Sequence, residues 1–238
     1  MKMKKIAYII LTLLMCGFLQ VYPQAQEEPS EKISLGIIGG INFATMHFPN
    51  SQDADDQRIT TLPGFGAGAV LDIHLSKNLY ARIEPMYLQK GGKIEEGQDA
   101  ANQPEGQIRT SSIEIPLLVQ YAFGDKIQPY LIGGPTVGYN LKSEIEFDLT
   151  GLEFTGDMKD VTATFDLGIT FGGGVQVPVR FGTIFLEGRY VYGLINQTTT
   201  GTTTVTSNGF QFDLSSDKEE DKHTNRGFQM FAGILINL

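Results

Sequence analysis

Apolar and polar residues alternate with a period of two along much of this chain. Side chains of a β-strand point to its two faces in turn, so this alternation predicts strands with one apolar face. About ten residues tilted at about 45° are enough to cross a bilayer as a strand. Eight stretches rich in Gly, Tyr, Phe, Val and Ile reach that length: Ile33–Met46, Pro63–Leu75, Leu79–Lys93, Ser111–Phe123, Ile127–Lys142, Thr164–Val179, Thr183–Gln197 and Arg226–Leu238.

The connections between these stretches alternate between long and short. The short ones, residues 76–78, 124–126 and 180–182, have the composition of tight turns. The long ones span residues 47–62, 94–110, 143–163 and 198–225, and the Thr-rich run at 198–206 suits either a loop or a hairpin. Barrels of outer membranes place tight turns at one end and long loops at the other. The sequence therefore predicts an all-β fold, an eight-stranded antiparallel up-and-down transmembrane β-barrel.

The N-terminal residues differ from the rest of the chain. Three lysines among the first five residues precede an apolar stretch at 6–19, and the small residue Ala25 follows. This order is typical of a secretory signal peptide, and the apolar stretch is shorter than the roughly 20 residues of a membrane-spanning helix. We expect a cleaved signal peptide at residues 1–25 and one outer-membrane β-barrel domain at 26–238. The only cysteine, Cys16, would be removed by this cleavage, so no thiol chemistry is expected.

Alternation also predicts which side chains face the lipid. Apolar sets lie on one face of the fourth, sixth and last stretches, with Val119, Ile169 and Phe228 as members, although Phe231 and Leu235 interrupt the polar face of the last stretch. In lipid the apolar face points outward and the polar face inward. A water-soluble barrel would bury the same apolar face instead, so the signal peptide and the one-sided loops favour the membrane.

Charged residues gather on the predicted inward face. An eight-stranded barrel is too narrow for an open pore and is filled by side chains. Burying charges unpaired is costly, so we interpret the set as a paired plug in which each arginine contacts at least one carboxylate. Small inward residues (Gly66, Gly68, Gly172 and Gly174) are expected to make room, and the inward Tyr130 is interpreted as plain packing. The charged set is Asp72, Arg82, Glu84, Glu114, Asp166, Glu187 and Arg189.

Several segments resemble the PorT-like "outer membrane protein beta-barrel domain" family. ISLGIIGGINFA (33–44) resembles its first strand, and LYARIEPMYLQKGGK (79–93) its L-x-P-E-L-x-Y-x-x-K-G pattern, with Glu84 and Pro85 in reversed order. SSIEIPLLVQYAFG (111–124) and IQPYLIGGPTVGYNL (127–141) resemble its L-E-I-P-L-L-x-K-Y and P-Y-x-x-x-G-P patterns. The resemblance implies a small barrel in the outer membrane of a Bacteroidetes-type bacterium, and it implies no reaction.

Composition and motifs exclude several functions. The mature chain keeps all 27 acidic residues but 15 of the 18 basic ones, a net charge of −12, which argues against nucleic acid as a partner. His47, His74 and His223 form no spaced motif with Ser and Asp, so we expect no enzyme and no cofactor. The acidic runs at 53–56 and 217–221 lack EF-hand spacing, although such carboxylates could bridge Ca²⁺ or Mg²⁺ to lipid phosphates. We interpret them as a solvated, repulsive loop surface.

We therefore expect a monomeric barrel embedded in outer-membrane lipid, with a filled, charged interior and acidic loops that face the cell exterior. Its role would be structural or in surface interactions. Two alternatives stay open. One is a soluble periplasmic barrel that binds a small apolar ligand, like a lipocalin. The other is an accessory factor in protein export to the cell surface, with a surface protein or the secretion machinery as partner.

Overall fold

β-Strands make up most of the part of the chain that the structure describes. This computed structural model describes residues 33–47, 57–96, 105–149, 152–207, 210–216 and 224–238, so the expected signal peptide lies outside it. Among these residues, no helix is both long enough and apolar enough to cross a membrane. The elements are β1 (Ile33–His47), β2 (Gln57–Thr61), β3 (Gly64–Ser76), β4 (Leu79–Ile83), β5 (Met86–Glu96), β6 (Glu105–Ala122), β7 (Gln128–Leu149), β8 (Leu152–Asp157), the 3-10 helix η2 (Lys159–Val161), β9 (Phe165–Val179), β10 (Gly182–Gly193), β11 (Gly201–Ser207), β12 (Phe210–Ser216) and β13 (Thr224–Asn237).

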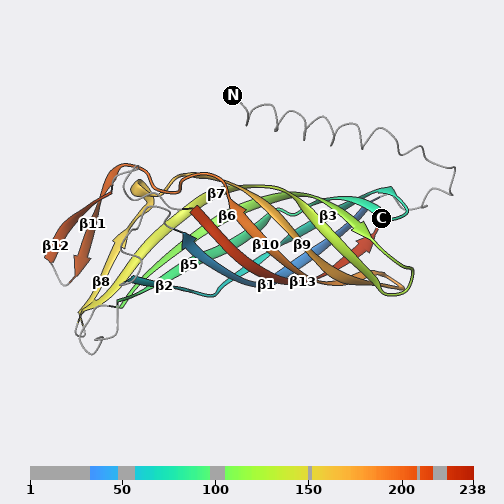
Figure 1. Ribbon diagram of the computed structural model, residues 1–238, viewed down its shortest axis with the longest axis horizontal. Helices are drawn as coiled ribbons and strands as arrows, with labels where there is room; N and C mark the ends of the chain where they lie inside the picture. Colours follow the sequence, from blue (N-terminus) through green and yellow to red (C-terminus); the bar gives the residue numbers. More distant parts are fainter. Residues whose placement is uncertain (1–32, 48–56, 97–104, 150–151, 208–209, 217–223) are drawn as a thin grey trace, which may run out of the picture. The chain divides into compact units, whose positions relative to one another are not determined.

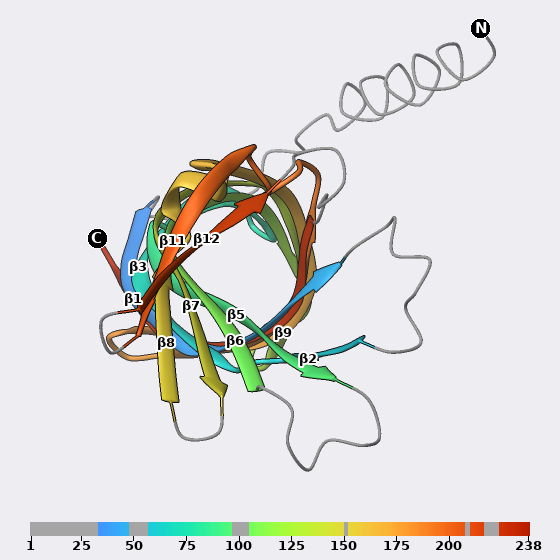
Figure 2. The ribbon, with the colours of Figure 1, turned by 90° about the vertical axis from the view of Figure 1, so that its left-hand side faces the viewer.

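The described strands close into an antiparallel ring of eight, with β4 and β5 counted as one. Each member pairs with the next in the order β1, β3, β4 with β5, β6, β7, β9, β10 and β13, and β13 pairs again with β1. The ring is seen end-on in Figure 2. The predicted number and direction of the strands are confirmed.

The third predicted strand is interrupted at Glu84 and Pro85, between β4 and β5. Proline has no backbone N–H and cannot donate to the ladder. Backbone hydrogen bonds to the neighbouring strands continue through the interruption. The Ala69 N–H donates to the Pro85 carbonyl at 3.0 Å, and the Glu84 N–H donates to the Pro116 carbonyl at 3.2 Å. The interruption therefore leaves the wall of the barrel continuous.

Following paired residues once round the ring gives the stagger of the strands. A path that leaves β1 at Phe43 returns to β1 at Ile33, ten residues lower, through Phe228, Tyr190, Phe171, Gly133, Val119, Ala81 and Ile73. With about 3.3 Å per residue and about 4.8 Å between strands, this stagger gives a tilt of about 41° and a backbone radius of about 8 Å. Inward side chains fill a lumen of this radius.

The two faces of the wall differ in polarity. Outward side chains such as Val119 and Phe228 are 46% and 45% exposed, whereas their inward neighbours Gln120 and Gln229 are buried. Phe231 and Leu235, which interrupt the polar face in sequence, also lie buried inside. A water-soluble barrel would place its apolar face inside, so the observed arrangement fits a wall surrounded by lipid.

Aromatic side chains mark both ends of the outward apolar band. Near the short turns, the rings of Tyr121 and Phe123 contact each other at 4.8 Å. Near the long connections, the rings of Tyr139 and Phe165 lie 5.5 Å apart. Such girdles are typical of the two membrane interfaces of outer-membrane barrels.

The long connections contain more strand than the sequence suggested. The β7 strand runs to Leu149 and forms a hairpin with β8, while β11 and β12 form a second hairpin at the Thr-rich run. Figure 1 shows these hairpins at the opposite end from the short turns. Reading residues 143–163 as a long loop was wrong, because a strand beyond the membrane has no lipid-facing side and loses the alternation used to find it.

Candidate functional site

The interior of the barrel holds the charged residues that the sequence singled out. The structure places all seven among its buried residues, none more than 6% exposed. They form two groups. We call Asp72, Arg82, Glu84, Glu187 and Arg189 the arginine cluster, and Glu114 and Asp166 together with Lys90 the lysine cluster.

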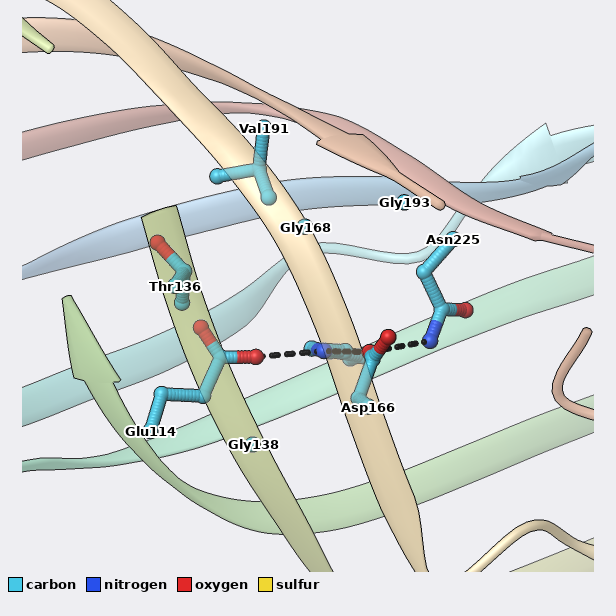
Figure 3. Close-up of a pocket in the computed structure, with 9 residues that line it drawn as sticks. Glu114, Thr136, Gly138, Asp166, Gly168, Val191, Gly193 and Asn225 are labelled. Atoms are coloured by element: carbon cyan, nitrogen blue, oxygen red, sulfur yellow. Dashed lines mark hydrogen bonds and ion pairs between the residues drawn. The ribbon is translucent and has the colours of Figure 1, made fainter. Parts of the chain in front are cut away.

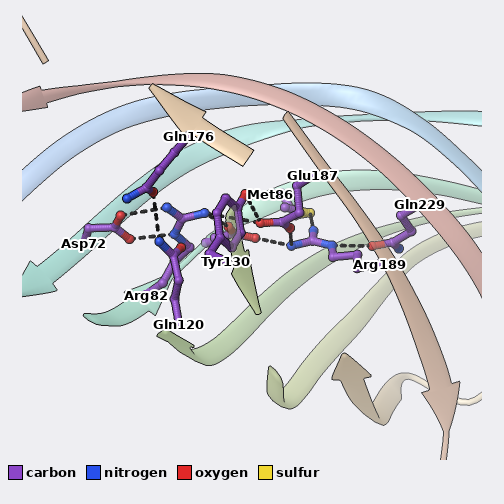
Figure 4. A network of polar contacts seen from close by, with 10 residues as sticks. Asp72, Arg82, Met86, Gln120, Tyr130, Gln176, Glu187, Arg189 and Gln229 are labelled. Atoms are coloured by element: carbon purple, nitrogen blue, oxygen red, sulfur yellow. Dashed lines mark hydrogen bonds and ion pairs between the residues drawn. The ribbon is translucent and has the colours of Figure 1, made fainter. Parts of the chain in front are cut away.

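The half of the arginine cluster that lies nearer the short turns is organised around Arg82 of β4 (Figure 4). Its Nε and Nη2 donate to the two carboxylate oxygens of Asp72 at 2.6 and 2.7 Å, a bidentate pair between neighbouring strands. Its Nη1 donates to Glu187 at 3.3 Å, and Glu84 lies 3.7 Å away. Glu187 belongs to β10, four places from β4 in the ring, so this contact crosses the lumen.

Arg189 of β10 makes the second crossing. Its Nη1 forms an ion pair with Glu84, at the junction of β4 and β5, and another with Glu187 at 3.2 Å. Its Nε donates to Gln229 at 2.8 Å, and its guanidinium lies 4.5 Å over the Phe231 ring. Figure 4 shows Arg189 held between Glu187 and Gln229. Both arginines therefore contact carboxylates on the opposite side of the barrel.

Tyr130 is part of this network, which corrects its interpretation as plain packing. Its hydroxyl donates to Glu187 at 2.9 Å, and its ring lies 5.7 Å from the Arg82 guanidinium. Two glutamines extend the network beside it, with Gln120 donating to Gln176 at 2.9 Å. Alternation identifies Tyr130 as inward but carries no sign of its partner, because Glu187 is 57 residues away in the chain.

The lysine cluster lies nearer the long connections and lines a small pocket (Figure 3). The Lys90 ammonium of β5 pairs with Glu114 of β6 and donates to Asp166 of β9 at 2.7 Å. Asp166 also accepts hydrogen bonds from Asn225 and Gln197, each at 3.0 Å. The pocket is lined by Lys90, Glu114, Thr136, Gly138, Asp166, Gly168, Val191, Gly193 and Asn225.

Lys90 is the functional side chain that sequence reasoning missed. It shares the parity of Arg82 and Glu84, so strict alternation along this stretch would have placed it inside. The signal was weak because Gln89 and Lys93, on the other face, are also polar.

Inward glycines provide the space for these side chains. A Cβ added to Gly172 would lie 2.6 Å from the Cβ of Arg189, and one on Gly174 would lie 2.6 Å from the Tyr130 hydroxyl. A Cβ on Gly66 would meet Leu88 at 2.7 Å and Phe231 at 2.9 Å. The expectation that these glycines make room agrees with the structure.

A family described as "Outer membrane protein beta-barrel domain" matches residues 24–199. The chain belongs to this family. No curated protein matches the chain.

Several solved outer-membrane proteins are similar to this outer membrane β-barrel. A major outer membrane protein from Thermus thermophilus is 12% identical, with 86% of this chain and 99% of that chain covered and a TM-score of 0.51. The outer membrane protein OprG from Pseudomonas aeruginosa is 10% identical, with 87% of this chain and 98% of that chain covered and a TM-score of 0.45. Neisserial surface protein A is 12% identical, with 87% of this chain and 97% of that chain covered and a TM-score of 0.41. At 12% identity the likeness to the Thermus thermophilus protein shows the fold alone.

Other residues considered from the sequence contribute less to the site. His74 packs edge-on against Tyr80, with the ring centres 4.6 Å apart. The side chains of His47 and His223 and the acidic runs at 53–56 and 217–221 lie outside the described residues. Within the described parts of the barrel, no three His, Cys, Asp or Glu side chains are grouped as a metal site requires.

The interior of this outer membrane barrel carries more acid than base. Its described buried residues include five carboxylates and three cations, an excess of two negative charges when all are ionised. The three basic side chains occupy the centres of the two clusters. Chemically, the arrangement joins opposite walls of the barrel and fills the space between them.

Proposed function

We propose that this protein is a non-catalytic, non-conducting outer-membrane barrel with a structural or surface-interaction role. The proposal is supported most directly by two ion pairs that cross the lumen, Arg82 to Glu187 and Arg189 to Glu84. Both join the β4–β5 strand to β10, which lies opposite it in the ring. In a barrel of about 8 Å backbone radius, such contacts leave little room for a continuous water path.

The lysine cluster adds a second barrier along the same lumen. Lys90, Glu114 and Asp166 come from three strands, and each is at most 7% exposed. An ion entering from the long connections would meet this cluster before the arginine cluster. Two separate barriers support a plug rather than the lining of a channel.

The second part of the proposal concerns orientation and partners. The long connections carry 18 acidic and five basic residues, whereas the short turns have a net charge of +2. We place the long connections outside the cell, in agreement with the usual topology of outer-membrane barrels. We also propose that the protein is a monomer. Acidic loops would favour a basic surface on any partner. The resemblance to PorT-like proteins suggests a Bacteroidetes-type source.

Planar-bilayer recordings test the sealed interior. The refolded mature chain should give no steady single-channel currents. Insertion must be shown independently, by heat-modifiable gel mobility and by protection of the strands from protease. Steady currents from wild-type protein would refute the plug. Protease added to intact cells should cleave within residues 198–225, and cleavage restricted to the short turns would refute the orientation.

A further inference from the structure

Arg226 is a charged residue on the lipid-facing side of the wall. It precedes Phe228 by two residues on β13 and therefore shares its outward face. Its register partner is Tyr192 of β10. Exposed apolar side chains lie nearby on the two paired strands and the residue after β10, with Phe228 45%, Tyr192 40% and Leu194 47% exposed.

The Arg226 side chain is held against Tyr192. Its Nη2 donates to the Tyr192 hydroxyl at 3.0 Å, and its guanidinium carbon lies 4.4 Å from the centre of the Tyr192 ring. Its Nε is buried and has no hydrogen-bond partner within the described parts of the chain. Its polar contact there is thus a phenol rather than a carboxylate.

The position of Arg226 along the barrel adds a second constraint. Arg226 pairs with Thr45, two residues beyond the Phe43–Phe228 pair and toward the long connections. Aromatic residues at this end of the apolar band mark the level of lipid headgroups. A long cationic side chain at such a level normally extends into water. The contacts with Tyr192 instead hold this guanidinium against the wall.

A phosphate group is the complementary ligand for a guanidinium held at this level. Guanidinium presents N–H donors in a planar fork that matches a phosphate, and hydrogen bonds between such charged groups are stronger than neutral ones. Headgroup phosphates are the anions present at this level of a bilayer. We propose that Arg226, positioned by Tyr192, binds the headgroup phosphate of a membrane lipid in the leaflet at the loop end of the barrel. This inference does not depend on the sealed lumen or on which leaflet faces the cell exterior.

Another outward cation provides a matched control. Lys142 on β7 forms an ion pair with Glu144 at 2.6 Å, and the two side chains are 60% and 44% exposed. Its charge is already neutralised and lies in water. Lys142→Gln therefore removes a positive charge near the same end of the barrel without touching the proposed site.

The test uses the mature chain refolded in detergent micelles and labelled with ¹⁵N-arginine. Dioleoyl phosphatidic acid is titrated into the micelles, and the Nε–H resonance of Arg226 is assigned from its loss in Arg226→Lys. This resonance should shift saturably with phosphatidic acid but not with dioleoylglycerol, which lacks the phosphate. Retention of phosphatidic acid in native mass spectrometry should weaken about tenfold in Arg226→Gln (about 1.4 kcal/mol) and stay unchanged in Lys142→Gln.

Several results would overturn the assignment. An equal shift with dioleoylglycerol would show that the phosphate is not recognised, and saturation by inorganic phosphate at the same concentration would show a free-anion site. Equal loss of lipid in Arg226→Gln and Lys142→Gln would show a general effect of charge. The wild-type titration needs only the charge-conserving Arg226→Lys protein, to assign the resonance, so it decides the question even if Arg226→Gln fails to fold.

Discussion

Arg189→Leu should destabilise the barrel more than any surface charge change. Its guanidinium contacts Glu84, Glu187 and Gln229 inside the wall. Breaking a buried ion pair by removing one partner typically costs about 3–5 kcal/mol, because the other charge stays buried. Leucine also removes the contact over Phe231 without restoring a hydrogen-bond donor.

The contacts show where that free energy is lost. Glu187 keeps Arg82 and Tyr130 as partners after the change. Glu84 keeps only the more distant Arg82 contact at 3.7 Å, since its Oε1 has no hydrogen-bond partner among the described residues and its Oε2 is bound by Arg189. Neutralising Glu84 in the same molecule should therefore recover on the order of 2 kcal/mol.

Urea unfolding in lipid vesicles measures these free energies. The chain has no tryptophan, so circular dichroism and heat-modifiable mobility follow the folded fraction. Lys142→Gln is the control, because an ion pair in water is screened and contributes little to stability. The reasoning is refuted if Arg189→Leu costs no more than Lys142→Gln. It is also refuted if Glu84→Gln fails to rescue Arg189→Leu.

Three further predictions concern the wall and the lysine cluster. Val119→Arg places a charge on the lipid face and should cost about 2–4 kcal/mol, seen as poorer folding into vesicles; wild-type yields would show that the face assignment is wrong. Gly66→Ala should lower the free energy of unfolding in urea by about 1–3 kcal/mol, because the added Cβ meets two buried side chains. In the control Gly39→Ala the nearest atom to the added Cβ is 3.8 Å away, so the free energy of unfolding should change by less than about 0.5 kcal/mol. Lys90→Met should lower the urea midpoint by leaving two carboxylates unpaired, and adding Glu114→Gln should raise it again; strictly additive effects would argue against the cluster.

The membrane-spanning strands were predictable because alternation reflects a physical boundary. Each wall residue faces either lipid or the packed lumen, so outward Val119 and inward Gln120 differ in polarity. Beyond the membrane this difference disappears, so the sequence predicts a loop where β8 lies and leaves the β11–β12 region open between a loop and a hairpin. Lys90 was missed for a related reason, since polar residues occupy both faces of its strand near the membrane edge.

The alternation along the chain predicts the membrane-spanning strands, their order and seven of the eight buried charges among the described residues, since these depend on a local pattern. Which of these charges pair is a property of the closed barrel. In sequence, Arg82 and Arg189 have Glu84 and Glu187 as near neighbours, yet Arg82 binds Asp72 in a bidentate pair and Arg189 contacts Glu84 across the lumen. Contacts across the barrel depend on the stagger of ten residues accumulated over eight strand pairs, and that quantity exists only once the ring has closed.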